Sequence, residues 1–285
     1  MKRLHRPDLY AWSCFDESRD VDFNSVAWVR TGGNVLIDPL PMSAHDREHL
    51  ERLGGASTIV VTNSDHTRSA AELASHFGAE LCGPRAEREG FALSCGRWLA
   101  DGDEAAPGLR VIELQGSKTP GELALVLEGT TLITGDLVRG HAAGSLNLLP
   151  AAKLASRDDA MASVRRIIQE YRVIDAVLVG DGWPVFRDGA LALAAMLQLE
   201  AFKAEAAAEG FLEVLERAWP PGTVLDRHTH PFDVKALVVR GELWLTIGSD
   251  TRRLTAGDTF ALERGVPHAE RYADAGAAYW VARRQ

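Results

Sequence analysis

Three histidines in the C-terminal part of the chain offer the clearest chemistry. His228 and His230 stand two positions apart, so on a β-strand their side chains would point to the same face. His268 follows further along, and these three are the only ones of the nine histidines that lie after residue 205. Neutral imidazoles that converge suit divalent transition metals such as Fe, Mn, Ni, Zn or Cu. The sequence therefore predicts a metal site made by His228, His230 and His268.

Two polar residues accompany the third histidine. Glu270 and Tyr272 follow His268 at alternate positions, so a regular strand would place all three side chains on one face. Three roles are open for them. Glu270 could bind the metal as a further ligand, or both residues could assist proton transfer beside it. Otherwise both are polar groups at the mouth of the fold. We take Glu270 and Tyr272 as candidate catalytic residues.

The elements that must position these side chains are short strands. From residue 211 to residue 285, alternating runs such as Glu242–Ile247 are separated by turn signals such as Pro220-Pro221-Gly222. Closely spaced strands with turns between them are typical of a small all-β barrel or sandwich. We expect residues 211–285 to form one such domain. Inward side chains such as Trp244 and Phe260 would give it a partly apolar pocket.

The first part of the chain has a different texture. Residues 1–187 alternate β-rich runs with helical stretches, which indicates a layered α/β architecture. The Ala-, Leu- and Glu-rich segment 188–210 is expected to form one connecting helix. The expected strands are Val26–Val29, Val35–Ile37, Thr58–Val61, Arg110–Glu113, Leu123–Leu127, Thr131–Thr134 and Ala176–Val179, and the expected helices are Ala44–Leu53, Ser69–His76 and Asp158–Tyr171.

The joint spacing of glycines and histidines in the second domain resembles that of a cupin, a small double-stranded β-helix barrel. The resemblance covers essentially all of residues 211–285. It rests on a glycine before the HxH pair, a turn glycine after it, and a glycine-initiated second motif that ends in a histidine. The matching residues are Gly222, His228, His230, Gly241, Gly257, Gly265 and His268.

One departure from the cupin pattern matters. The family pattern has a glutamate ligand four positions after the second histidine, and this chain has Val234 there. Asp233 is adjacent, but strand alternation would turn it away. The resemblance then implies a three-histidine site, as in some cupin dioxygenases, or a site completed by a carboxylate such as Glu270.

The first domain resembles the metallo-β-lactamase fold, an αββα sandwich with metal ligands on loops at one edge. The resemblance covers roughly residues 10–187 and lies in a series of strand ends and turns. These are the segments Val35–Asp38, Ile59–His66, Gly116–Gly121, Leu132–Asp136 and Val177–Pro184. Together the two resemblances imply an α/β domain followed by an all-β domain.

Most of the metal ligands of this second family are absent. Its pattern is HxHxDH, a histidine before Thr-Pro-Gly, the aspartate of a Gly-Asp pair, and a histidine in a Gly-His-Gly turn. This chain keeps only the pair Asp65–His66 of the first motif, has Lys118 in place of the next histidine, retains Asp136, and has Asp181 in place of the last. The resemblance therefore implies that the first zinc site is lost.

Two arrangements of the remaining residues are open. Asp65, His66, Asp136 and Asp181 could hold one hard cation such as Mn²⁺ or Mg²⁺. Alternatively, Lys118 could fill the vacant metal position and pair with Asp136 and Asp181, because clustered carboxylates need a cation nearby. In the second case the domain is a non-hydrolytic remnant used for folding, dimerisation or ligand binding.

Composition narrows the classes of partner. The 285 residues carry a net charge of −9, which argues against non-specific binding to nucleic acid or to anionic membranes. No run approaches the roughly 18 apolar residues of a membrane helix, and the N-terminus does not resemble a secretory signal. The three cysteines form no CxxC pair, so we expect a cytoplasmic protein. A homodimer is plausible for a cupin.

Three functions are compatible with these residues. The cupin could be an enzyme, such as a three-histidine dioxygenase or an isomerase, that holds Fe, Mn, Ni or Zn and acts on a small molecule. It could instead be a non-catalytic module that binds or senses a small molecule. Lastly, the first domain could be a single-metal hydrolase. Both folds host many chemistries, so fold alone does not choose among these functions.

Overall fold

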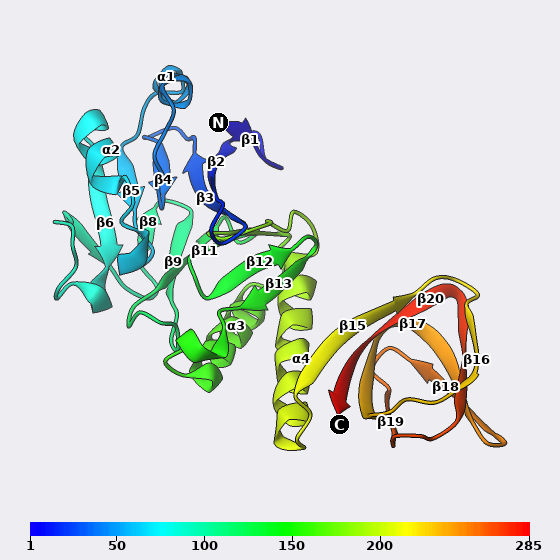
Figure 1. Cartoon of the computed structure of the whole chain (residues 1–285). Coiled ribbons are helices and arrows are strands. Elements are labelled where there is room, and N and C mark those ends of the chain that lie inside the picture. Colours follow the sequence, from blue (N-terminus) through cyan, green and yellow to red (C-terminus); the bar gives the residue numbers. More distant parts are fainter. The chain divides into compact units, whose positions relative to one another are not determined.

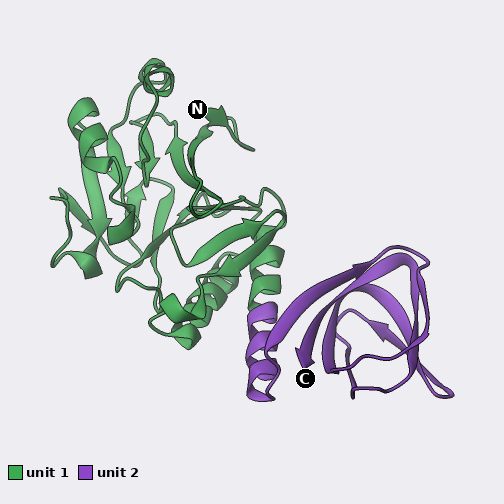
Figure 2. Ribbon diagram, in the orientation of Figure 1, with its two compact units in different colours: residues 1–197 green, residues 198–285 purple.

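A computed structural model describes residues 1–285 (Figure 1). The chain divides into two compact units, residues 1–197 and residues 198–285 (Figure 2). The boundary between the units falls within helix α4 (Gly189–Ala208), in the segment where the sequence predicts a connecting helix. None of the helices combines the length and apolar composition that a membrane-spanning helix needs.

The first unit is built on two sheets and a separate hairpin, β12–β13. The first sheet has the order β1-β2-β3-β4-β5-β6-β7, and the second has the order β14-β11-β10-β9-β8. The strands are β1 (Lys2–Arg3), β2 (Leu9–Asp16), β3 (Val21–Trp28), β4 (Val35–Ile37), β5 (Thr58–Val60), β6 (Glu80–Pro84), β7 (Arg97–Leu99), β8 (Glu104–Ala106), β9 (Leu109–Glu113), β10 (Leu123–Leu127), β11 (Thr131–Thr134), β12 (Val138–Ala142), β13 (Ser145–Leu148) and β14 (Ala176–Val179).

The continuous apolar runs of the inner strands are explained by burial on both faces. Leu123 and Leu125 of β10 pack into a core that the two sheets share. Ala124 and Val126, which alternate with them, pack instead into a core with the helices α3 (Arg157–Glu170) and α4. The second sheet is therefore a buried middle layer.

Helices complete the layers on the other side. Leu50 of α1 (Ala44–Arg52) and Leu73 of α2 (Ala70–Phe77) pack against the outer face of the first sheet. The result is the αββα sandwich that the sequence predicts. Three short 3-10 helices, η1 (Ser64–His66), η2 (Arg85–Glu87) and η3 (Ala151–Lys153), lie in the connections.

Helix starts follow local hydrogen bonding. The hydroxyl of Ser43 accepts the backbone N–H of Asp46 at the start of α1, and Ser156 accepts that of Asp159 at the start of α3. Such caps satisfy backbone donors that the first helical turn leaves free. The predicted boundaries of these two helices agree with the structure to within a residue.

The second unit is an antiparallel barrel formed by β15 (Glu213–Trp219), β16 (Val224–His228), β17 (Asp233–Ile247), β18 (Asp250–Thr255), β19 (Thr259–Leu262) and β20 (His268–Arg284). The two long strands, β17 and β20, pair with each other along most of their length (Figure 1). Two register shifts interrupt that pairing, near Val238 and near Gly241. Such bulges bend strands, which lets the sheet curl around its own core.

Gly241 belongs to the second of these bends. Its φ of 73° lies in the left-handed region, and a side chain there would collide with the carbonyl oxygen of Gly276 on β20. The cupin-like glycine is therefore needed for the close approach of two backbones. On the outer surface of the barrel, Phe202 and Ala206 of α4 pack against Leu237 and Trp280.

Candidate metal centre

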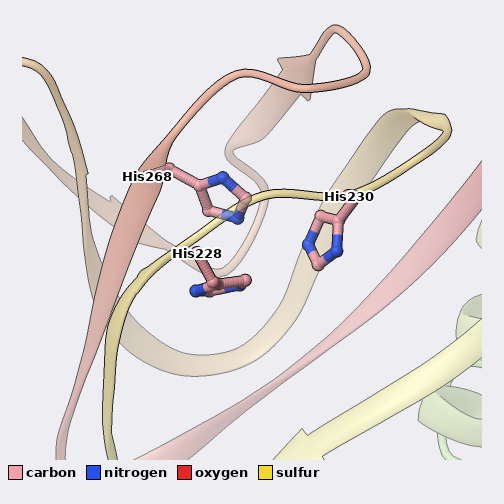
Figure 3. A group of neighbouring side chains, drawn as sticks. All are labelled: His228, His230 and His268. Carbon is pink, nitrogen blue, oxygen red and sulfur yellow. The ribbon is translucent and has the colours of Figure 1, made fainter.

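The pairing of β16 with β20 brings the three predicted histidines together. His228 at the end of β16 and His268 at the start of β20 are directly paired residues. His230 lies just beyond β16, in the turn before β17. One ring nitrogen from each of the three lies within 4.8 Å of the others. Figure 3 shows the three rings grouped around one small space.

Backbone carbonyls fix the orientation of two of the rings. The Nδ1 atom of His228 lies 2.7 Å from the carbonyl oxygen of Asp226, and Nδ1 of His268 lies 3.0 Å from that of Val266. A carbonyl oxygen only accepts, so each Nδ1 must carry the hydrogen. Each Nε2 then keeps its lone pair, which is the form that binds metals.

The Nε2 atom of His268 provides the test of whether a metal fits. It is buried and has no hydrogen-bond partner in the structure. A buried polar atom without a hydrogen-bond partner is costly, and the neighbouring groups are two more imidazoles and, at 3.7 Å, a carboxylate oxygen of Glu270. A divalent transition ion among His228, His230 and His268 would satisfy all three lone pairs. The residues present therefore fit such an ion.

His230 is held by packing and by the turn around it. Its ring stacks on Phe232, with 5.1 Å between ring centroids and an interplanar angle of 6°, and its carbonyl accepts the N–H of Gly265. Burial lowers the pKa of His230, and its electrostatic interactions with His268, His228 and Arg283 lower it further. The ring is therefore neutral near pH 7 and able to donate a lone pair.

The expected glutamate ligand is indeed absent from the site. Val234 is 5% exposed and faces the cavity beside the histidines. Asp233 is turned away, where it accepts the N–H of Arg264 at 2.9 Å and pairs with Arg284. The donor set is therefore three imidazoles, with no carboxylate at the position of Val234.

Glu270 lies next to this group. Its Oε1 atom is 3.7 Å from Nε2 of His268, and its other oxygen accepts a hydrogen bond from the hydroxyl of Tyr272. The hydroxyl of Tyr279 lies 3.2 Å from that of Tyr272 and receives a hydrogen bond from Trp219. Burial, followed by the nearby Tyr279 and Glu270, raises the pKa of Tyr272 far above its usual range. Tyr272 therefore keeps its proton and donates a hydrogen bond to Glu270.

Tyr279 is a member of this network that the sequence did not reveal. It lies on β20 beyond the bend at Gly276, and alternation cannot be counted from His268 through that bend. The prediction that Trp244 points into the pocket is wrong. Trp244 lies on the other face of β17, beneath the guanidinium of Arg271 at 4.1 Å. The register shift just before it reverses the alternation.

The barrel encloses a cavity of about 560 Å³ beside the histidines. Most of its wall is apolar, and Arg217, Arg283, Asp226, Glu270 and Tyr279 contribute polar groups. Cavities of this size hold small molecules rather than polymers. The apolar lining consists of Trp219, Val224, Leu225, Phe232, Val234, Phe260, Leu262 and Val281.

The first unit holds a second cluster of possible ligands, in which His66, Asp136 and Asp181 have ligand atoms within 4.8 Å of one another. Positively charged side chains of the protein already occupy this cluster. Nζ of Lys118 lies 2.7 Å from Asp65 and 2.9 Å from Asp136.

The prediction of the partners of Lys118 is partly wrong. Lys118 pairs with Asp136 as expected, but its second partner is Asp65. Asp181 is taken by Arg139, whose Nε lies 3.0 Å from its Oδ2. Arg139 is on the β12 strand, which the sequence did not predict, so this pairing could not be foreseen.

His66 lies between two carboxylates in the same cluster. Its Nδ1 is 2.8 Å from Asp38, and its Nε2 is 3.5 Å from Asp136. Burial alone would lower the pKa of His66, and Arg68 also opposes its charge, but Asp38 and Asp136 outweigh both and raise the pKa to about 9. Although the guanidinium of Arg68 lies 3.3 Å from Nε2, the raised pKa favours the imidazolium form near pH 7, which has no lone pair for a metal.

Comparison with known proteins agrees with both parts of this description. The sequence model of the metallo-beta-lactamase superfamily matches residues 1–199, and that of the cupin domain matches residues 216–282. The chain belongs to the metallo-beta-lactamase superfamily and carries a cupin domain, which confirms both resemblances. No curated protein matches the chain significantly.

Solved structures support the fold of the first unit. The metallo-beta-lactamase DIM-1 has a TM-score of 0.57 at 16% identity, covering 70% of this chain and 96% of that chain. A metallo-beta-lactamase from Pontibacter korlensis has a TM-score of 0.55 at 17% identity, covering 68% and 96%. One from Erythrobacter litoralis has 0.53 at 12% identity, covering 69% and 91%. Identities this low show the fold alone.

Removing the ammonium of Lys118 should destabilise the first unit. Lys118→Met keeps the aliphatic stem but leaves the buried carboxylate of Asp136 without this partner, so the free energy of unfolding should fall by about 2 kcal/mol. Urea unfolding measures the change. Lys153→Met is the matched control, because Lys153 lines the same cleft with no carboxylate partner and should change stability by less than about 0.5 kcal/mol. Equal effects would contradict the assigned role of Lys118.

The imidazolium of His66 should make stability depend on pH. Its pKa is raised from 6.5 to about 9 on folding, so its contribution is complete below pH 6.5 and is lost as the pH rises towards 9. The free energy of unfolding should fall by about 3 kcal/mol over that interval. His66→Gln, which can still donate to Asp38, should flatten this slope in urea titrations. An unchanged slope in the variant would show that another group titrates.

Proposed function

We propose that this protein is a metal-dependent cupin that acts on a small molecule, with His228, His230 and His268 holding Fe, Mn, Ni or Zn. The observation that carries the proposal is the buried, unpartnered Nε2 of His268, which lies beside two further imidazoles. When bound, the ion would supply a Lewis acid with open coordination positions, and in the case of iron a redox centre.

The residues around the histidines support chemistry on a bound molecule. The cavity of about 560 Å³ adjoins two of the histidines and is largely apolar, so it would exclude water from a small substrate. Glu270 faces the same cavity and is in position to accept a proton from that substrate. Tyr272 would hold the carboxylate in place. Oxygenation and isomerisation are the reaction types that this arrangement favours.

A non-catalytic binding or sensing module is the second candidate. It is favoured by the absence of a carboxylate ligand at Val234 and by the engagement of Glu270 with Tyr272. In that case the molecule would bind without being converted. Oxygen uptake or product formation by the iron-loaded protein separates the two. For the first unit we propose a scaffold that does not hydrolyse, because Lys118 and Arg139 occupy its former metal position.

Loss of one histidine should remove the metal. His230→Ala deletes one of three donors, so the affinity for Zn²⁺ or Ni²⁺ should fall on the order of 100-fold or more. Isothermal titration of the full-length protein measures this change. His45→Ala, an exposed histidine on α1, is the control and should bind metal as the parent protein does. A variant at position 230 that binds as tightly as the parent would rule out the proposed site.

A further inference from the structure

The charge around the histidines is unusual for a site that binds a cation. Three neutral imidazoles cancel none of the charge of a divalent ion, and the position where the cupin pattern has glutamate holds Val234. An anionic ligand is what such a donor set lacks.

A guanidinium lies beside that valine. Val234 and Arg283 are directly paired residues on β17 and β20, and both side chains line the cavity. The guanidinium of Arg283 covers the ring of Phe232 at 4.6 Å, and that ring stacks on His230. The ring of Phe232 therefore contacts both the guanidinium of Arg283 and the ring of His230, one of the proposed metal ligands.

Arg283 also has unused hydrogen-bonding capacity. Its Nε is buried and has no partner, and its ion pair with Glu213 is long, at 3.7 Å. A second guanidinium, that of Arg217 on β15, lines the same cavity and has no carboxylate within ion-pair distance. Two arginines thus face a cavity with few acceptors for them.

The two acidic residues on the cavity wall do not supply the missing charge at Val234. Glu270 is held by the hydroxyl of Tyr272 and lies next to His268. Asp226 is exposed, and its backbone carbonyl already orients His228. A negative charge beside Val234 would therefore have to be supplied by a bound molecule.

We propose that the cavity takes a small carboxylic acid whose carboxylate lies against Arg283, next to the metal position. The planar fork of a guanidinium matches a carboxylate, and the apolar body of the acid would pack on Phe260, Leu262 and Val281. This inference rests on the proposed metal site, since the acid's negative charge would lie beside both the ion and the arginine.

The test compares acids with neutral molecules of the same shape. Zn²⁺-loaded full-length protein is titrated with benzoate and with benzamide, and with hexanoate and hexanamide. At least one acid should bind about tenfold more tightly than its amide, the difference that one charge-assisted hydrogen bond provides. Binding is reciprocal, so the same acid should tighten Zn²⁺ binding by the factor by which Zn²⁺ tightens acid binding.

Two variants assign the effect to its residues. Arg283→Gln should remove the preference for the acid while leaving Zn²⁺ affinity without acid nearly unchanged. Val234→Glu should tighten Zn²⁺ binding and abolish the preference, because the protein then supplies the anion. Arg253→Gln is the control, since Arg253 is an exposed residue on β18 that pairs with Glu242. Circular dichroism establishes that each variant is folded.

The outcomes separate the inference from the proposed function. If the parent protein binds no Zn²⁺ at the histidines, the proposed function is wrong. If it binds Zn²⁺ but neither acid exceeds its amide, the inference about the substrate class is wrong and the metal site stands. If the preference survives in Arg283→Gln, Arg283 is not the group that recognises the acid.

Discussion

Two backbone carbonyls set the geometry on which the cupin site depends. The carbonyls of Asp226 and Val266 take the Nδ1 hydrogens of His228 and His268, which leaves both Nε2 lone pairs free. Each of these carbonyls stands two residues before the histidine that it orients, so both contacts are local. The pairing of β16 with β20 then places His228 opposite His268. Local carbonyls thus orient two of the rings, and strand pairing brings these two histidines together.

In the first unit, the constraint is the charge of the residues at the position where the family binds metal. Several carboxylates converge at one edge of its sheets, where charge repulsion would oppose folding without a cation. Lys118, His66 and Arg139 supply that positive charge from within the chain. A fold of the metallo-beta-lactamase superfamily is therefore retained after most of its metal ligands have been replaced. The chemistry of the protein is consequently expected in the second unit.

Features with a local or periodic signal could be predicted from the sequence. The inner strands β4 and β10 are continuous apolar runs, and their ends agree with the prediction. Helical periodicity marked α1 and α3, and the structure shows their first turns capped by Ser43 and Ser156. The three histidines were predicted as metal ligands because their spacing follows the cupin pattern. A set of residues at defined spacing is more specific for a metal site than a single histidine.

Features that depend on long-range pairing could not be predicted. Asp38 is 28 positions from His66 in the sequence, yet the two are hydrogen-bonded across the former metal cleft. Arg139 reaches Asp181 from the unpredicted hairpin, and Arg283 meets Val234 only through the pairing of β17 with β20. The error at Trp244 has the same origin, because a bulge breaks the alternation on which the expectation relied.

We expect the protein to bind a transition metal at the three histidines, and not in the first unit, where Lys118 takes the place of a metal. Anomalous scattering from crystals of the full-length protein grown with Zn²⁺ tests it most directly. A peak is expected among the Nε2 atoms of His228 and His268 and a ring nitrogen of His230, with none beside Lys118. A peak between His66 and Asp136, or no peak at the three histidines, would contradict it.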